Sequence, residues 1–94
     1  MTLVIRKNRP ADNGFGDRGA VRRRAATYVA VDEDGRVRAD IERTSAPTYG
    51  DSPEWRVTTY DQEGMRRYTA YRRTLAEAKT HAVDLVATVD AEMA

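Results

Sequence analysis

The sequence has little of the chemistry on which metal and redox sites depend. Its 94 residues include no cysteine and a single histidine, His81. Without cysteine there is neither a disulfide framework nor a zinc–thiolate site, and one histidine cannot build a histidine-rich metal centre. The acidic cluster Asp32–Asp34 lacks the spacing of an EF-hand loop. We therefore expect no metal site and no cofactor.

Long apolar runs are also missing. The longest continuous run has about four residues, far fewer than the roughly twenty that a transmembrane helix needs. The opening residues, Met1 to Arg6, lack the apolar core of a secretory signal peptide. These two absences predict a cytoplasmic protein that does not use a membrane.

Catalytic motifs are scarce as well. Neither Ser45 nor Ser52 stands in the Gly-x-Ser-x-Gly turn of the hydrolases. The pattern G-x-G-x-x-G does occur at Gly14–Gly19, but the dinucleotide fingerprint requires a preceding strand and a following helix, and a hairpin pattern follows here. His81 lies in a helical pattern, where a solvated or hydrogen-bonded side chain is the simpler interpretation. We expect that the protein is not an enzyme.

What the chain does contain is strand-like alternation around two similar turns. Apolar and charged residues alternate from Val37 to Ile41, and a second alternation runs from Trp55 to Tyr60. The tetrapeptides Asp32–Gly35 and Asp61–Gly64 both end in glycine, which supplies the positive φ that closes a short hairpin loop. The pattern predicts two β-hairpins with one apolar face, and that face needs a cover.

The end of the chain predicts an amphipathic helix that supplies this cover. Thr74 and Glu77 fit a capping box, and apolar residues recur at three- and four-residue steps from Leu75 to Met93. We therefore predict an α+β fold, an antiparallel meander of about four strands with one C-terminal helix packed on one face. Residues 25–94 would form this single ββββα domain.

Two segments do not fit the pattern and are candidate contact regions. Residues 1–24 contain three glycines, a proline and seven basic residues, and we expect a basic N-terminal arm or an edge strand there. Residues 44–54 contain two prolines and a glycine and predict a long loop, in which Tyr49 is a candidate contact residue.

Charge is segregated along the chain although the total is only +1. Residues 1–24 carry a net charge of +5 and residues 66–73 carry +4, while the other segments are acidic. Fourteen of the sixteen basic residues are arginine. A GC-rich genome would produce this bias without selection, and the alternative is selection for guanidinium contacts with phosphate or carboxylate. Such a divided surface suits nucleic acid, an acidic protein partner or self-association.

The densest aromatic and basic pattern lies in the expected last strand. Alternation places Arg67, Tyr71 and Arg73 on one face, an arrangement that suits phosphate contacts and base stacking. The same face would carry Asp40 and Glu42, which are unfavourable for a dedicated DNA-binding protein. A solvated face with weak surface ion pairs is therefore the simpler interpretation.

Two resemblances follow from these motifs. The order of two hairpins followed by a helix that starts Thr-Leu-Ala-Glu-Ala-Lys resembles small uncharacterised proteins of actinobacteria and their phages over residues 25–94. This resemblance implies a fold and no activity. The sheet with one C-terminal helix is also similar to AP2-like and integrase arm-binding domains, which bind a DNA groove with the open face of the sheet. That similarity implies DNA contacts by Arg36, Arg38, Arg67, Tyr71 and Arg73.

Two hypotheses of function come from these patterns. We expect a non-enzymatic small interaction protein, a phage protein of the host cytoplasm that acts on a host protein or through self-association. The alternative is a nucleic-acid-binding module that uses the basic arm and the Arg/Tyr strand. The candidate contact residues for both are Arg22, Arg23, Arg24, Arg36, Arg38, Tyr49, Arg67, Tyr71 and Arg73.

Overall fold

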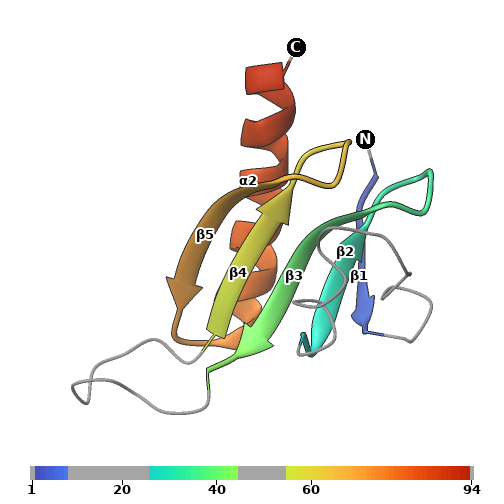
Figure 1. Ribbon diagram of the computed structural model, residues 1–94. Helices are drawn as coiled ribbons and strands as arrows, with labels where there is room; N and C mark the ends of the chain where they lie inside the picture. The colour runs from blue at the N-terminus through green and yellow to red at the C-terminus, as the bar shows by residue number, and fades with distance from the viewer. Residues whose placement is uncertain (1, 9–25, 45–54, 94) are drawn as a thin grey trace.

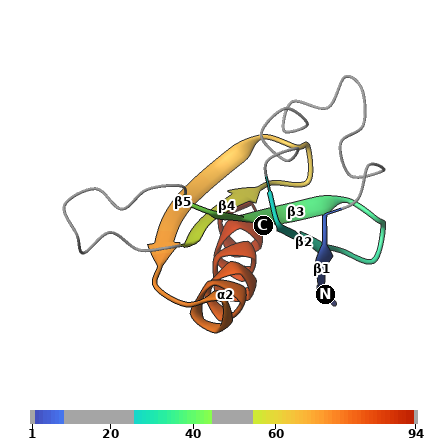
Figure 2. The same ribbon diagram turned by 90° about the horizontal axis from the view of Figure 1, so that it is seen from below.

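The chain folds into one antiparallel sheet with one helix across it. The computed structural model describes residues 2–8, 26–44 and 55–93. The strands lie in the sheet in chain order, and each pair of neighbours is antiparallel. Figure 1 shows α2 crossing behind the sheet, and Figure 2 shows that it covers one face. The elements are β1 (Val4–Lys7), β2 (Tyr28–Val31), β3 (Val37–Arg43), β4 (Trp55–Tyr60), β5 (Arg66–Arg72) and α2 (Leu75–Met93).

The predicted antiparallel sheet with a C-terminal helix is confirmed, but the sheet has five strands and not about four. Strand β1 is the addition, with Val4 paired to Val31 and Lys7 to Tyr28. The N-terminal segment thus supplies an edge strand, which was one of the two structures expected for it. Four residues are too few to show a period of two, and the partner of β1 lies far along the chain, so alternation could not reveal the pairing.

The two similar turns form as predicted. Gly35 and Gly64 have φ angles of 80° and 86°, a region that favours glycine because it has no Cβ. In the first turn Asp32 Oδ1 accepts hydrogen bonds from the backbone N–H groups of Asp34 and Arg36, at 2.9 and 3.0 Å. Asp61 does the same in the second turn. The aspartate at the start of each turn therefore explains the repeated sequence as turn chemistry.

The core lies between α2 and one face of the sheet. Small side chains on the helix allow it to lie close to the strands, and Ile41 and Val57 fill the centre of the layer with no exposure to water. Burial of each of these two side chains contributes about 1.5–3 kcal/mol. The fully buried members of this core are Ala30, Ala39, Ile41, Val57, Ala78, Ala82 and Val86.

The helix begins where the capping pattern predicts. Thr74 Oγ1 accepts a hydrogen bond from the backbone N–H of Glu77 at 3.1 Å, which satisfies one of the unpaired amides of the first turn. The predicted apolar stripe faces the sheet except at its end, where Met93 is half exposed. Among the residues that the structure describes, no helix has the length and apolar character needed to cross a bilayer.

The face opposite α2 is more enclosed than one-sided alternation predicts. Val29, Asp40, Thr58 and Tyr60 lie on this face and are all buried. Tyr60 donates its hydroxyl to Asp40 Oδ2 at 2.5 Å, which is how the sheet accommodates a buried carboxylate. Strand β5 differs from this region, because most of its residues are exposed.

Candidate interaction surface

Strand β5 forms the outer edge of the sheet. In the described part of the chain it pairs only with β4, so its other backbone edge faces outward. In an antiparallel sheet about half of the N–H and C=O groups of such a strand point away from their neighbour. At seven residues β5 is nearly twice as long as β1, the opposite edge. It therefore offers a longer row of backbone donors and acceptors.

Strand β5 contains three basic side chains and no acidic one. Arg66, Arg67 and Arg72 lie in the strand, and Arg73 follows it directly. Tyr71, between these arginines, is 46% exposed. Arg66 and Arg73 are exposed and take part in no ion pair among the residues that the structure describes. We call the outward side of residues 66–73 the basic edge.

Two of the arginines fasten the basic edge to the helix. Arg67 lies 3.9 Å from a carboxylate oxygen of Glu92, and Tyr68 donates its hydroxyl to the same carboxylate. This hydrogen bond is the main reason that the pKa of Tyr68 is raised. Arg67 was expected to share one face with Tyr71 and Arg73, but its side chain lies beside Glu92 of α2 instead. The reason is a register irregularity between Thr58 and Tyr60, which shifts the alternation at the start of β5.

Arg72 makes the second contact with α2. Its Nη2 atom lies 3.0 Å from Nδ1 and 2.9 Å from Nε2 of His81. A guanidinium group can only donate, so the ring nitrogen that accepts must carry no proton. Partial burial, and secondly the charge of Arg72, lower the pKa of His81 below its usual range. His81 thus acts as a hydrogen-bond acceptor that positions β5.

The face of β5 turned away from α2 is held by a row across three strands. Glu42, Arg56 and Tyr71 are successive register partners on β3, β4 and β5. Arg56 donates to Glu42 at 2.7 Å, and this hydrogen bond is the main cause of the raised pKa of Arg56. The acidic charge of Glu42 is therefore compensated within the sheet, and Tyr71 lies at the outer end of the row.

Arg38 is not placed where a partner could reach it. Its side chain is 1% exposed. Its Nε atom donates to the carbonyl of Tyr60 at 3.1 Å, and its Nη2 atom donates to Asp90 of α2 at 2.5 Å. The expectation of an exposed DNA-contacting side chain is corrected here. A register irregularity between Ala30 and Val31 shifts the pairing at Arg38, so the simple alternation does not hold for this residue.

The remaining candidates do not join the basic edge. Arg36 is exposed in the turn between β2 and β3. Strand β4 lies between β3 and β5 in the sheet, so this turn does not adjoin the basic edge. Of the predicted contact residues within the described ranges, Tyr71, Arg73 and Arg67 are exposed at β5, and Arg67 lies beside Glu92 of α2. Arg22, Arg23, Arg24 and Tyr49 lie outside the described residues, as does the Gly14–Gly19 pattern.

Two functional features were missed from the sequence. One is the position of β5 at the edge of the sheet, which requires the strand order. The other is the pair of contacts Arg38–Asp90 and Arg67–Glu92. A signal for the second was present, because the last turn of α2 has acidic residues and no basic one. Carboxylates are unfavourable at the negative end of a helix dipole, so cations from elsewhere should lie near them.

Comparisons with known proteins add no relative. A scan against protein-family models finds no match to this chain. Searches of curated proteins and of solved structures also find no similar protein. The resemblances to actinobacterial and phage proteins and to sheet-based DNA-binding domains therefore stay predictions, and the function has to be inferred from the chemistry of the basic edge.

Proposed function

We propose that this protein is a non-enzymatic interaction protein that binds an acidic, extended segment of a partner protein along β5. The observation that carries this proposal is a long, exposed edge strand with basic side chains and no acidic ones. An extended segment added to such an edge gains main-chain hydrogen bonds, and its side chains determine the specificity. Each of those hydrogen bonds contributes about 0.5–1.5 kcal/mol.

Charge supports a partner that is acidic and is not a second copy of the same edge. If β5 paired with β5 of another copy, arginines would lie opposite or close to arginines, which is unfavourable. An acidic strand would instead place carboxylates beside Arg66 and Arg73, which have no ion pair among the described residues. The resemblance to phage proteins supports a host protein as the source of this strand.

Fluorescence anisotropy with a labelled short peptide, in which glutamate alternates with threonine, tests the proposal. The double variant Arg66→Glu/Arg73→Glu should bind the peptide at least about tenfold more weakly than the unchanged protein. The matched control is Lys7→Glu/Arg36→Glu, which changes the net charge equally at two exposed residues on the other side of the sheet. Equal weakening by the two variants would show a nonspecific charge effect and contradict the proposal.

Nucleic-acid binding is the second candidate, supported by one feature. Tyr71 has an exposed aromatic ring and is followed in the sequence by Arg72 and Arg73. An aromatic ring beside guanidinium groups suits base stacking combined with phosphate contacts. The hypothesis predicts a mobility shift of single-stranded DNA or RNA at low salt. The salt slope of this binding should become smaller when Arg22, Arg23 and Arg24 are replaced by alanine. Absence of any shift at low salt would exclude this function.

A further inference from the structure

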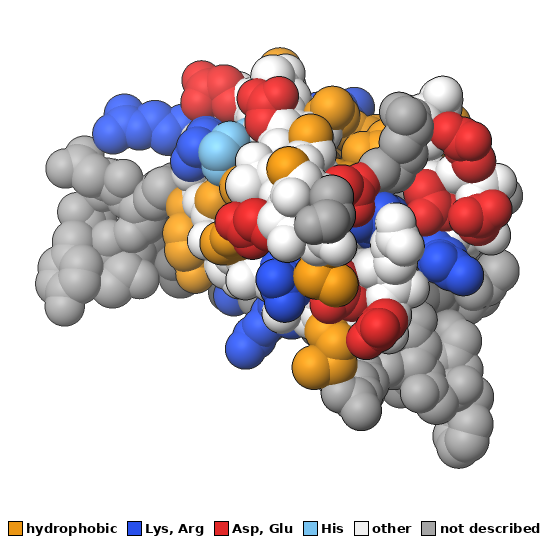
Figure 3. Space-filling model, turned by 90° about the horizontal axis from the view of Figure 1, so that it is seen from above, with side chains coloured by type: hydrophobic (Ala, Val, Ile, Leu, Met, Phe, Trp, Pro, Cys, Tyr) orange, Lys and Arg blue, Asp and Glu red, His pale blue; other side chains and the backbone are white. Residues whose placement is uncertain are grey.

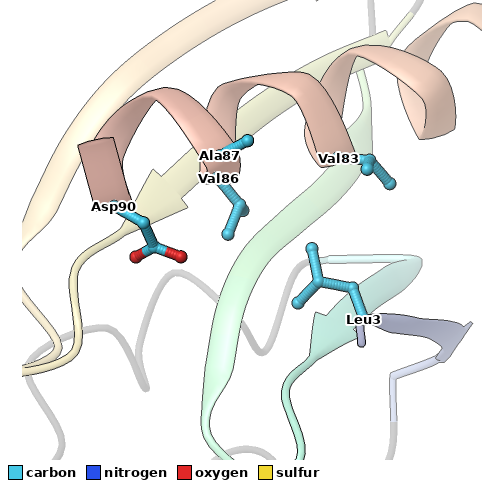
Figure 4. Close-up of a pocket in the computed structure, with 5 residues that line it drawn as sticks. All are labelled: Leu3, Val83, Val86, Ala87 and Asp90. Carbon is cyan, nitrogen blue, oxygen red and sulfur yellow. The ribbon is translucent and has the colours of Figure 1, made fainter. Parts of the chain in front are cut away.

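A pocket lies between α2 and the segment that leads into β1, away from the basic edge. It has a volume of about 400 Å³. Its walls are apolar except at one end, where Asp90 contributes a carboxylate (Figure 4). Figure 4 also shows the side chain of Leu3 facing Val83 and Val86 across the pocket. Among the residues that the structure describes, the pocket is lined by Leu3, Val83, Val86, Ala87 and Asp90.

The helix supplies one side of this pocket with a regular stripe. Val83, Val86, Ala87 and Asp90 are spaced three, four and seven residues apart, so they lie on one side of α2. Val83, on this side of the helix, is 44% exposed. The protein therefore leaves an apolar surface open to solvent beside a carboxylate.

The carboxylate of Asp90 is only half satisfied. Its Oδ1 atom accepts from Arg38, but its Oδ2 atom is buried and has no hydrogen-bond partner in the part of the chain that the structure describes. A carboxylate oxygen without a donor costs free energy when water cannot reach it. The Asp90 side chain as a whole is 23% exposed and lines the pocket, so the carboxylate lies at the boundary between Arg38 and the open space.

The charge around this end of the pocket favours a cation. Arg38 is shared between Asp90 and Asp32, at 2.5 and 3.8 Å, so one guanidinium faces two carboxylates. Glu33 lies in the adjacent turn, and acidic side chains gather on that side of the molecule in Figure 3. The negative end of the α2 dipole adds to this field, because Asp90 lies in the last turn.

We infer that this pocket binds a small aliphatic amine, with its ammonium group at Asp90 and its hydrocarbon stem between Leu3, Val83 and Val86. The ammonium supplies the donor that the carboxylate lacks, and the stem covers the exposed part of Val83. This ligand site is separate from the peptide-binding edge, so either can fail without the other. For so small a ligand the dissociation constant should be on the order of 1 mM.

Titration of the ¹⁵N-labelled protein with n-hexylamine at neutral pH, followed by NMR, tests the inference. The amides of Leu3, Val83, Ala87 and Asp90 should shift together and saturate. n-Hexanol, which has the same stem without the charge, should bind at least about tenfold more weakly. Equal midpoints for the two compounds, or shifts confined to other residues, would overturn the inference.

Two variants connect the binding to the pocket. Val83→Trp fills the pocket from an exposed position and should abolish the shifts, whereas Thr88→Trp, at an exposed β-branched residue of the same helix outside the lining, should leave them unchanged. Asp90→Asn keeps the shape and removes the charge, so it should reduce the preference for hexylamine over hexanol. If Asp90→Asn does not fold, the comparison of the two tryptophan variants decides. Unchanged binding in Val83→Trp would contradict the site.

Discussion

Arginines at two places in one sheet have opposite surroundings. Arg38 of β3 is enclosed between the Tyr60 carbonyl and two carboxylates, with almost no exposed surface. Arg66 and Arg73 at the edge are exposed and have no ion pair among the described residues. For these three residues, a central position in the sheet gives an arginine that holds the fold together, and an edge position gives arginines that are open to a partner.

Arg67 and Arg72 are intermediate, because they belong to the edge strand and also help to hold the fold together. Each lies on β5 and contacts α2, one through Glu92 and the other through His81. Both contacts are partly exposed, so each should contribute little to stability. Their value lies in position, because two contacts near opposite ends of one strand hold β5 against α2. A preorganised edge loses less conformational entropy when a partner strand binds.

The largest effect should come from breaking the enclosed arginine. Replacing Arg38 by methionine leaves Asp90 and Asp32 without their shared cation, and removal of one partner from a buried pair costs about 3–5 kcal/mol. We expect Arg38→Met to lower the free energy of unfolding by roughly 3 kcal/mol in urea denaturation. Arg36→Met, at an exposed turn residue, is the control and should change it by less than about 0.5 kcal/mol. Equal losses of unfolding free energy in the two variants would contradict the assignment of Arg38 as a residue that holds the fold together.

Two tyrosines extend the same comparison at a smaller scale. Tyr60 donates to the buried Asp40, whereas Tyr71 lies exposed on β5. Tyr60→Phe removes one donor from a buried carboxylate and should cost about 1–2 kcal/mol. Tyr71→Phe should cost about 0.5 kcal/mol or less, because its contact with Arg56 lies at a partly exposed site. Thermal unfolding of the two variants measures the difference, and a larger loss for Tyr71→Phe would contradict the assignment of Tyr60 as the enclosed tyrosine and Tyr71 as the exposed one.

The smallest effect should be a pH dependence at His81. Because its pKa is lower in the folded chain than in the unfolded chain, the unfolded state binds the proton more readily. Stability should be complete above the ordinary histidine pKa of about 6.5 and should fall as the pH drops below it. His81 is partly exposed, so the loss by pH 5 should be about 0.5 kcal/mol or less.

The measurement is the difference in urea midpoint between pH 7 and pH 5 for the unchanged protein and for His81→Gln. The variant should lose the part of the dependence that comes from this histidine, while the carboxylates contribute equally to both proteins. A histidine whose NMR titration midpoint lies above the ordinary value would contradict the contact with Arg72.

Local patterns were enough to predict most elements of the fold. The turns, the capped helix and the alternating strands depend on neighbours along the chain, and Gly35, Gly64 and Thr74 show the predicted conformations or hydrogen bonds. The five-stranded order could not be obtained in this way, because pairing of β1 with β2 joins residues far apart in the sequence.

The candidate site was harder to predict than the fold, for a related reason. A period of two assumes an unbroken register, and the irregularities near Arg38 and Arg67 redirect two of the predicted contact residues. Once one residue is out of register, alternation assigns it to the wrong face. Tyr71 and Arg73, beyond the second irregularity, lie exposed as alternation predicts, whereas Arg67 is exposed but lies beside Glu92 of α2. The acidic composition of the last turn of α2 was the sequence signal for the contacts of Arg38 and Arg67 with this helix.

Hydrogen exchange along β5 in the presence of the acidic peptide reports directly on strand addition at the basic edge. A partner strand added to the edge should slow exchange of the outward-pointing amides between Arg66 and Arg72, because they gain hydrogen bonds that they lack in the free protein. The amides of β1, the opposite edge, should exchange as before. Peptide binding that leaves the β5 amides unprotected, or that protects β1 instead, would contradict strand addition at the basic edge.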